Sequence, residues 1–332
     1  MRALLCPASL KGVLSARAAA AALARGARDV GVEVAELPVA DGGEGTGEIL
    51  EAALGGKWRE AVVSDPLGRP VAARWLLLPD GRAVVEAAAA IGLPLLAPGE
   101  RDPLRASSRG LGELLLAALA ESPGSLLVAL GGSATVDGGA GLREVVRALP
   151  VPTVVLCDVR TRLDGAARLF GPQKGASPDD VAVLERRLAA IEELRPFAEL
   201  PGAGAAGGLG AAFAALGAEL VPGAAALLDL LGFDELLAEQ DLVVTGEGQV
   251  DRTTVEGKAP GEVAGRCAAA GVRCVVFGGR VLNEIEGAET VALSGDPARA
   301  EEDLVELGRR LGCTSWRKTG IRSRRFRSRE DP

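Results

Sequence analysis

Short hydrophobic runs alternate with alanine- and leucine-rich segments of helical periodicity at both ends of the chain. The runs that predict buried strands are residues 3–6, 32–40, 241–245, 272–277 and 290–293. The periodicity predicts a helix over 15–30, with Ser15 as its N-cap, and a last helix over 298–311. Strands that alternate with helices are typical of parallel sheets, so the two ends are predicted to share one doubly wound, mainly parallel α/β sheet.

The middle of the chain has another pattern. Residues 58–88 alternate short apolar runs with turn sequences, which predicts antiparallel hairpins. A helix is expected over 110–121, and Ser177 followed by Pro178 predicts the start of another. The apolar runs at 126–130 and 153–157 could belong to either sheet. The predicted domains are a discontinuous Rossmann- or flavodoxin-like α/β domain at 1–60 and 236–315, an inserted mixed α/β domain at 61–235, and a basic tail at 316–332.

Composition narrows the chemistry. The 332 residues suffice for two domains, and 48% hydrophobic with 25% charged residues is typical of a globular protein. Histidine is absent, which excludes serine-histidine hydrolysis and histidine-zinc sites. The five cysteines show no CxxC spacing, so reduced thiols are expected. No signal peptide or long uncharged apolar stretch is present in the sequence, and we expect a soluble, cytoplasmic protein.

The charge is unevenly distributed. The net charge is -8, yet residues 316–332 contain seven basic and two acidic residues. The rest of the chain is therefore strongly acidic, and neither nucleic acid nor a membrane is expected as a partner. The tail has few large apolar residues and is expected to be disordered; an arm that contacts nucleic acid or a membrane is the alternative.

Four glycine-rich, acid-bearing loops follow predicted strands, at residues 39–46, 129–142, 201–210 and 245–251. The acids at strand ends are Asp41, Asp137, Asp158, Glu247 and Asp251. In an open α/β sheet these ends line the ligand crevice, and glycine lets backbone N–H groups approach an anion. No Walker motif or dinucleotide fingerprint is present. Each loop alone favours a structural turn, whereas four together favour a ligand site.

Several cations are candidates for anion binding. Lys11 lies between the first strand and the first helix, and Lys174 lies in a turn rich in proline and glycine; either ammonium could face phosphate or solvent. Lys258 could pair with Glu247 or with a ligand. Arg101 and Arg109 bracket residues 101–110, where an exposed structural role is the alternative to carboxylate binding.

Seven segments stand in a characteristic order between about residues 2 and 280. They are 7–16 (PASLKGVLSA), 38–46 (PVADGGEGT), 101–104 (RDPL) with 108–110 (SRG), 131–135 (GGSAT), 170–176 (FGPQKGA), 201–210 (PGAGAAGGLG) and 245–248 (TGEG). Together they resemble the bacterial glycerate kinases of the type that lacks a Walker P-loop. The resemblance implies ATP- and Mg²⁺-dependent phosphorylation of D-glycerate, usually on the 2-hydroxyl, by two α/β domains that close over an active-site cleft.

On this resemblance we assign candidate roles, with a homodimer as the candidate assembly. The candidate catalytic residues are Lys11, Asp137, Asp158 and Glu247. The candidate metal ligands are Asp137, Glu247 and Asp158. The candidate substrate-binding residues are Asp41, Arg101, Arg109, Ser133 and Thr135. The candidate nucleotide-binding residues are Lys174, Gly204, Gly207, Gly208, Gly246 and Gly248.

Three positions depart from the family pattern. Ala8 stands where an acid is common, Val136 replaces an asparagine, and Gln249 replaces the arginine of the usual GEGR segment. These departures keep two alternatives open: an impaired homologue that binds a nucleotide or organic acid, and a kinase for another small hydroxy acid. A Rossmann oxidoreductase is disfavoured, because no dinucleotide fingerprint follows the first strand. For the product, 2-phosphoglycerate is favoured over 3-phosphoglycerate.

Overall fold

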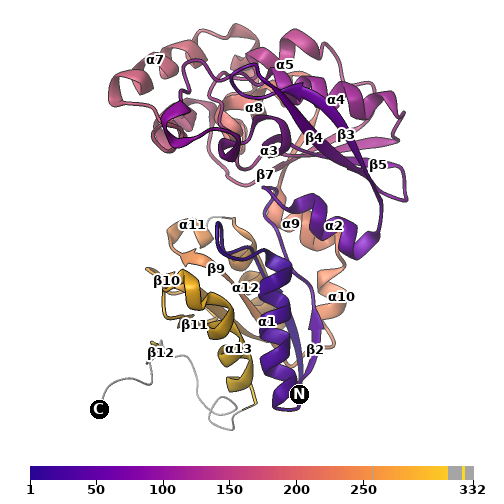
Figure 1. The fold of residues 1–332 in the computed structure, drawn as a ribbon, viewed down its shortest axis with the longest axis vertical. Coiled ribbons are helices and arrows are strands. Elements are labelled where there is room, and N and C mark those ends of the chain that lie inside the picture. The colour runs from indigo at the N-terminus through magenta and orange to yellow at the C-terminus, as the bar shows by residue number, and fades with distance from the viewer. Residues whose placement is uncertain (256, 313–323, 326–332) are drawn as a thin grey trace. The chain divides into compact units, whose positions relative to one another are not determined.

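The computed structural model describes residues 1–255, 257–312 and 324–325, and these form two compact units (Figure 1). Unit 1 comprises residues 1–40 and those from Leu227 onward, and unit 2 comprises residues 41–226. The predicted tail at 316–332 lies outside the described residues apart from Arg324 and Arg325.

Unit 1 is built on a six-stranded sheet in which every neighbouring pair is parallel, in the order β12-β11-β10-β9-β1-β2. Its strands are β1 (Arg2–Pro7), β2 (Glu33–Glu36), β9 (Leu242–Val250), β10 (Arg273–Val281), β11 (Glu289–Ala292) and β12 (Arg324–Arg325). This confirms the parallel sheet predicted from the two ends of the chain. The second strand is shorter than the predicted 32–40, although the amides of Leu37 and Val39 still donate to carbonyls of β1.

Helices flank the sheet of unit 1. They are α1 (Ala16–Asp29), α10 (Phe233–Leu237), α11 (Arg252–Val255), α12 (Ala259–Ala270) and α13 (Ala300–Arg310). Helices α1 and α13 lie side by side (Figure 1), and their aliphatic side chains form one core with residues of the central strands such as Leu5 and Phe277. Helix α12 packs on β9, β10 and β1. None of the helices in the described residues is long and apolar enough to cross a membrane.

Unit 2 contains a mixed sheet in the order β3-β4-β5-β6-β7-β8. Its strands are β3 (Lys57–Ser64), β4 (Pro70–Leu77), β5 (Arg82–Glu86), β6 (Ser125–Ala129), β7 (Thr153–Cys157) and β8 (Glu219–Pro222). The first three are antiparallel neighbours, as the hairpin pattern predicts, and β5 to β8 pair in parallel. The apolar runs at 126–130 and 153–157, which the sequence left open, therefore belong to this second sheet.

The helices of unit 2 cover an aliphatic core. They are α2 (Thr46–Leu54), α3 (Ala87–Ile91), α4 (Arg109–Ala120), α5 (Ala140–Val145), α6 (Ala166–Phe170), α7 (Pro178–Ala189) and α8 (Ala205–Ala215). The core contains Phe213 and many leucines and alanines. The predicted helix starts are confirmed, because Ser15 accepts from the amide of Ala18 in unit 1, and Ser177 and Asp180 form a capping box on α7.

The boundaries of the two compact units, at 40/41 and 226/227, differ from the predicted domain boundaries at 60/61 and 235/236. Strand β3 begins at Lys57 and pairs along its whole length with β4, while α2 packs on β4 and β5. Residues 41–60 are therefore grouped with unit 2. At the other boundary, α9 (Gly223–Leu230) contains the change from one unit to the next. A discontinuous domain with an insert, at these shifted bounds, is our proposal for the domain organisation.

Candidate functional site

In unit 2, two glycine-rich loops and an acid meet at the carboxyl ends of β6 and β7. The amide of Gly131 donates to the carbonyl of Gly42 at 3.0 Å. A Cβ at Gly131 would lie 2.5 Å from Cα of Gly43 and 3.2 Å from Oδ2 of Asp158. Only glycine permits this approach, so the close contact explains the glycine at 131 and brings the loop after Asp41 to the Asp158 carboxylate.

Lys174 is buried in the same region, with 4% of its surface exposed. Its Nζ donates to Oγ of Ser133 at 3.1 Å and to the carbonyl of Thr135 at 2.9 Å. Burial lowers the pKa of this ammonium to about 8, and the carboxylates of Asp158 and Asp137 oppose that shift. The structure therefore gathers four of the predicted residues, Lys174, Ser133, Thr135 and Asp158, into one polar cluster.

Two buried polar atoms beside this cluster have no hydrogen-bond partner within the described ranges: Nε of Arg101 and Oγ1 of Thr135. The turn after Lys174 packs on Arg101, since a Cβ at Gly175 would lie 2.5 Å from the Arg101 carbonyl. Leaving a buried polar atom unpaired costs about 1–3 kcal/mol, so each of these two atoms needs a partner such as water or a ligand.

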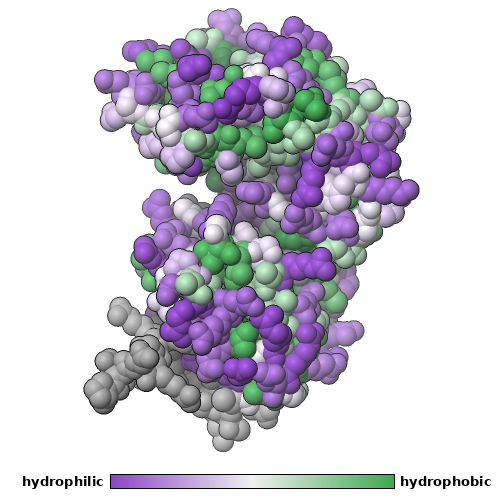
Figure 2. Space-filling view, in the orientation of Figure 1, coloured by the Kyte–Doolittle hydropathy of each residue, from purple (hydrophilic) through white to green (hydrophobic). Residues whose placement is uncertain are grey.

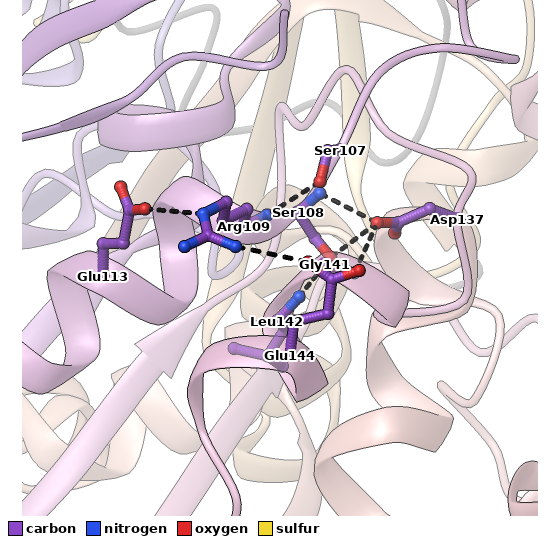
Figure 3. Close-up of polar contacts among 8 residues, drawn as sticks. All are labelled: Ser107, Ser108, Arg109, Glu113, Asp137, Gly141, Leu142 and Glu144. Atoms are coloured by element: carbon purple, nitrogen blue, oxygen red, sulfur yellow. Dashed lines mark hydrogen bonds and ion pairs between the residues drawn. The ribbon is translucent and has the colours of Figure 1, made fainter. Parts of the chain in front are cut away.

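Both carboxylate oxygens of Asp137, a predicted metal ligand, accept hydrogen bonds from the protein (Figure 3). Its Oδ2 accepts from the amide and hydroxyl of Ser108 at 2.8 and 2.7 Å and from the amide of Gly141 at 3.1 Å. Its Oδ1 accepts from the amide of Gly139 at 3.0 Å. The carboxylate thus ties the start of α5 to the start of α4. These hydrogen bonds fix the loop at 131–139, and a catalytic or metal-binding role for Asp137 stays a prediction.

We expect Asp137→Asn to destabilise unit 2, because the amide nitrogen cannot accept the hydrogen bonds that one carboxylate oxygen now receives. The expected loss in the free energy of unfolding is about 1–3 kcal/mol, measured by urea denaturation. Asp164→Asn is the control, since Asp164 is exposed and makes no hydrogen bond or ion pair in the described part of the chain. Unchanged stability together with a large loss of turnover would instead favour a direct catalytic role.

Arg109 is engaged at the surface (Figure 3). Its guanidinium pairs with Glu113 at 2.9 Å and with Glu144 at 3.3 Å, and half of the side chain is exposed. These acids engage the guanidinium at the surface of α4 and α5. Between the two predicted arginines, the geometry favours Arg101 for binding a carboxylate.

The predicted nucleotide-binding glycines of the 201–210 loop are used for packing. Gly204, Gly207 and Gly208 are buried, and a Cβ at Gly207 would lie 2.2 Å from the Thr135 carbonyl. Gly207 and Gly208 have positive φ values of 71° and 97° within α8. In unit 1, a Cβ at Gly246 would likewise lie 2.2 Å from the Phe277 carbonyl. These close contacts explain why glycine is needed at Gly207 and Gly246, and nucleotide binding by the backbone of these loops stays a prediction.

Unit 1 contains a cavity of about 430 Å³ at the carboxyl ends of β1, β9, β10 and β11. Its volume is within the usual range of small-molecule sites. Among the candidate residues taken from the sequence, Lys11, Glu247, Gly248, Asp251 and Lys258 line it. Apolar residues, among them Val13 and Leu293, line another part. Figure 2 shows a small hydrophobic area over the loop between β1 and α1. Val13, a residue of this loop, is 39% exposed.

Carboxylates on the β9 side of the cavity are held in a local network. Glu247 accepts from the Thr254 hydroxyl at 2.7 Å and pairs with Lys258 at 3.5 Å. Hydrogen bonds from the Thr253 hydroxyl, and then from Gln249, lower the pKa of Asp251 to about 2. Asp251 is therefore ionised at every physiological pH.

Three charged residues that line this cavity were not predicted from the sequence: Arg280, Asp296 and Asp303. Arg280 follows Gly278 and Gly279 at the end of a predicted strand, so a glycine pair at a strand's carboxyl end was the signal available. Asp303 lies in α13 and is 1% exposed, with Oδ2 bonded to the amide and hydroxyl of Ser294. Nothing in the local sequence marks a helical aspartate as buried.

The carboxylates of the candidate site could bind Mg²⁺ only if water and phosphate oxygens supply most of its ligands. Among the described residues no group of three or more acids or cysteines is arranged to hold a metal. Mg²⁺ needs no such group, because one or two carboxylates with water and phosphate oxygens suffice. In unit 2 the candidate carboxylate is Asp158, next to the loop that follows Asp41, and it too interacts with the protein. Asp137 is occupied by backbone and hydroxyl donors, and Glu247 by Thr254 and Lys258.

A parallel sheet with a cavity lined by both cations and carboxylates, and a mixed sheet with a buried lysine, define a two-unit α/β protein. The glycerate kinase family model matches residues 3–149 and 143–296, and the chain belongs to this family. It is therefore a kinase, a phosphotransferase with an alcohol group as acceptor.

Individual relatives agree with this assignment. The chain is 39% identical over 309 residues to "Glycerate kinase" of Bacillus subtilis, covering 80% of this chain and 81% of the relative. It is 38% identical to "Glycerate 2-kinase" of Escherichia coli, with the same coverage. A crystal structure from Salmonella typhimurium LT2, described as glycerate kinase 2, superposes with a TM-score of 0.79 at 32% identity, covering 96% of this chain and 98% of that one.

Proposed function

We propose that this chain transfers the γ-phosphoryl group of ATP to the 2-hydroxyl of D-glycerate in the presence of Mg²⁺. The family supports the coarser part, a kinase that acts on glycerate. The observation that carries the rest is the polar cluster around Lys174, where a buried ammonium, a carboxylate and two unpaired buried polar atoms stand within one unit. A small molecule with one carboxylate and two hydroxyl groups matches this set of donors and acceptors.

Unit 2 supplies the groups suited to glycerate. Arg101 would bind the carboxylate, because its Nε is a buried donor that lacks a partner in the described ranges. Thr135 and Ser133 would bind hydroxyl groups. Lys174 would neutralise negative charge as it develops on the transferred phosphoryl group.

Unit 1 supplies the groups suited to ATP. Lys11 would bind phosphate oxygens at the cavity, and the backbone of Gly248 would lie against the ligand. The apolar lining at Val13 and Leu293 would accept the adenine ring. Mg²⁺, when bound, neutralises charge on the phosphate oxygens, and Asp158 is the carboxylate that we propose as its ligand.

Val136 is one of the three departures from the family pattern that raised the alternative of an impaired homologue. This side chain is 1% exposed and belongs to the hydrophobic core of unit 2. The position where the family has an asparagine is thus filled by a core side chain in this chain. The turnover assay tests whether the lost amide matters for catalysis. We also propose a cytoplasmic location, where free thiols such as the buried Cys6 and Cys157 persist.

The test is an assay of ADP release from ATP with D-glycerate, coupled to phosphorus NMR of the product. We expect ADP release that requires both D-glycerate and Mg²⁺, with 2-phosphoglycerate as the product. ATP without glycerate is the control for background hydrolysis. A signal of 3-phosphoglycerate would overturn the assigned hydroxyl. ATP binding without turnover would favour the impaired homologue, and turnover only with another hydroxy acid would favour the second alternative.

A further inference from the structure

Two cavity-lining residues of unit 1 stand opposite each other on neighbouring strands. Gln249 of β9 and Arg280 of β10 are register partners in the parallel ladder, and both line the cavity. Neighbouring strands are about 4.8 Å apart, and register partners project from the same face of a sheet. The two side chains therefore start from adjacent points on the cavity wall.

The two side chains differ in charge. At 249 the family pattern has arginine, whereas this chain has a neutral glutamine whose Nε2 donates to Asp251 at 2.9 Å. The adjacent strand carries a guanidinium at 280. A positive charge that is missing from one strand is thus present on the next, at the paired position.

The guanidinium of Arg280 is not paired with another side chain among the described residues. Its side chain is exposed and makes no hydrogen bond or ion pair with the described residues. Two other cations show the contrast. Lys258, also at the cavity, pairs with Glu247 at 3.5 Å, and Arg273, on the same strand as Arg280, pairs with Glu289 at 3.9 Å. Arg280 therefore has its donors available for a ligand in the cavity.

We propose that Arg280 is a phosphate-binding residue of the unit 1 cavity, and that it replaces from β10 the arginine that the family pattern places at 249 on β9. A guanidinium offers paired donors in a planar fork that matches phosphate oxygens, which glutamine cannot do. Lys11, on the loop between β1 and α1, supplies a second cation at the same cavity. Identifying the phosphate as that of ATP rests on the proposed function.

The test moves the charge from one strand to the other. We expect Arg280→Ala to weaken ATP binding, measured by calorimetry on the full chain, by about 10- to 100-fold, the usual range for losing a charge-assisted hydrogen bond. Adding Gln249→Arg to that variant should recover most of the affinity. Arg273→Ala is the matched control on the same strand and should bind ATP as the wild type does.

The readouts separate this inference from the proposed function. Wild-type ATP affinity in Arg280→Ala would overturn the role of Arg280. A loss that Gln249→Arg does not repair would overturn the replacement of one strand's arginine by the other's. A wild-type chain that binds ATP but does not phosphorylate glycerate would contradict the proposed function alone, since the calorimetry would still report on Arg280.

Discussion

Replacing Lys174 with methionine is expected to lower kcat/KM for glycerate by about 10²- to 10³-fold, the usual effect of removing one group that stabilises transition-state charge. Methionine fills a similar buried volume without the ammonium, so the loss would report charge more than packing. The measurement is the ADP-release assay under saturating ATP. Lys57→Met is the control, because Lys57 is an exposed residue of β3 in the same unit. Near wild-type activity in Lys174→Met would remove Lys174 from the catalytic machinery.

The pKa of Lys174 adds a pH dependence to this prediction. Because burial lowers the pKa to about 8, the ammonium is present below that pH and is lost above it. We therefore expect kcat/KM to fall as the pH rises through 8. In Lys174→Arg the fall should move to much higher pH, since a guanidinium stays protonated. A fall at pH 8 that persists in this variant would assign the titration to another group.

The same shift affects stability in the opposite direction. The pKa in the folded chain lies below the ordinary value of 10.5, so between pH 8 and 10.5 the unfolded chain binds more protons at this site. The contribution of Lys174 to the free energy of unfolding should therefore increase with pH in this window. Activity and stability would change in opposite senses, which separates loss of the ammonium from loss of the fold.

Asp158→Asn carries the second largest expected effect, a loss of turnover of about 10²-fold or more with a higher Mg²⁺ requirement. The carboxylate is our proposed metal ligand, and it also raises the pKa of Lys174. The variant should therefore lower the pH at which kcat/KM begins to fall, which a residual-activity profile would show.

Asp164→Asn, at an exposed position of the same unit, is the control for Asp158→Asn. A variant with normal turnover and an unmoved pH profile would exclude Asp158 from both roles. A shifted profile with normal turnover and Mg²⁺ requirement would leave Asp158 as a neighbour of Lys174 alone.

Much of the fold could be read from local patterns. Period-two alternation with turn sequences gave the hairpins of β3, β4 and β5, and alternating strands and helices gave the parallel sheet of unit 1. Helix starts followed from caps such as Ser15 and Ser177, whose partners lie three residues away. Such signals depend on neighbours in the chain, so they survive without knowledge of the tertiary structure.

The candidate site was only partly predictable. The acids and glycines at strand ends pointed to loops that lie near Lys174 or line the unit 1 cavity, because parallel strands end at one edge of the sheet. The roles within the loops were not readable, since they depend on contacts between distant segments. Asp137 is held by Ser108, Gly207 packs on Thr135, and Arg280 is the partner of Gln249, across separations of about thirty or more residues.

The sequence by itself determined that this is an α/β protein without imidazole chemistry, and its motifs indicated the glycerate kinase family. Only the tertiary structure decided which polar groups are satisfied by the protein and which remain available. It engaged Asp137 and Arg109 in internal bonds and ion pairs, and it buried Lys174 beside Asp158. The reason is physical: hydrogen bonding and desolvation depend on which segments pack together, and a linear sequence does not specify those neighbours locally.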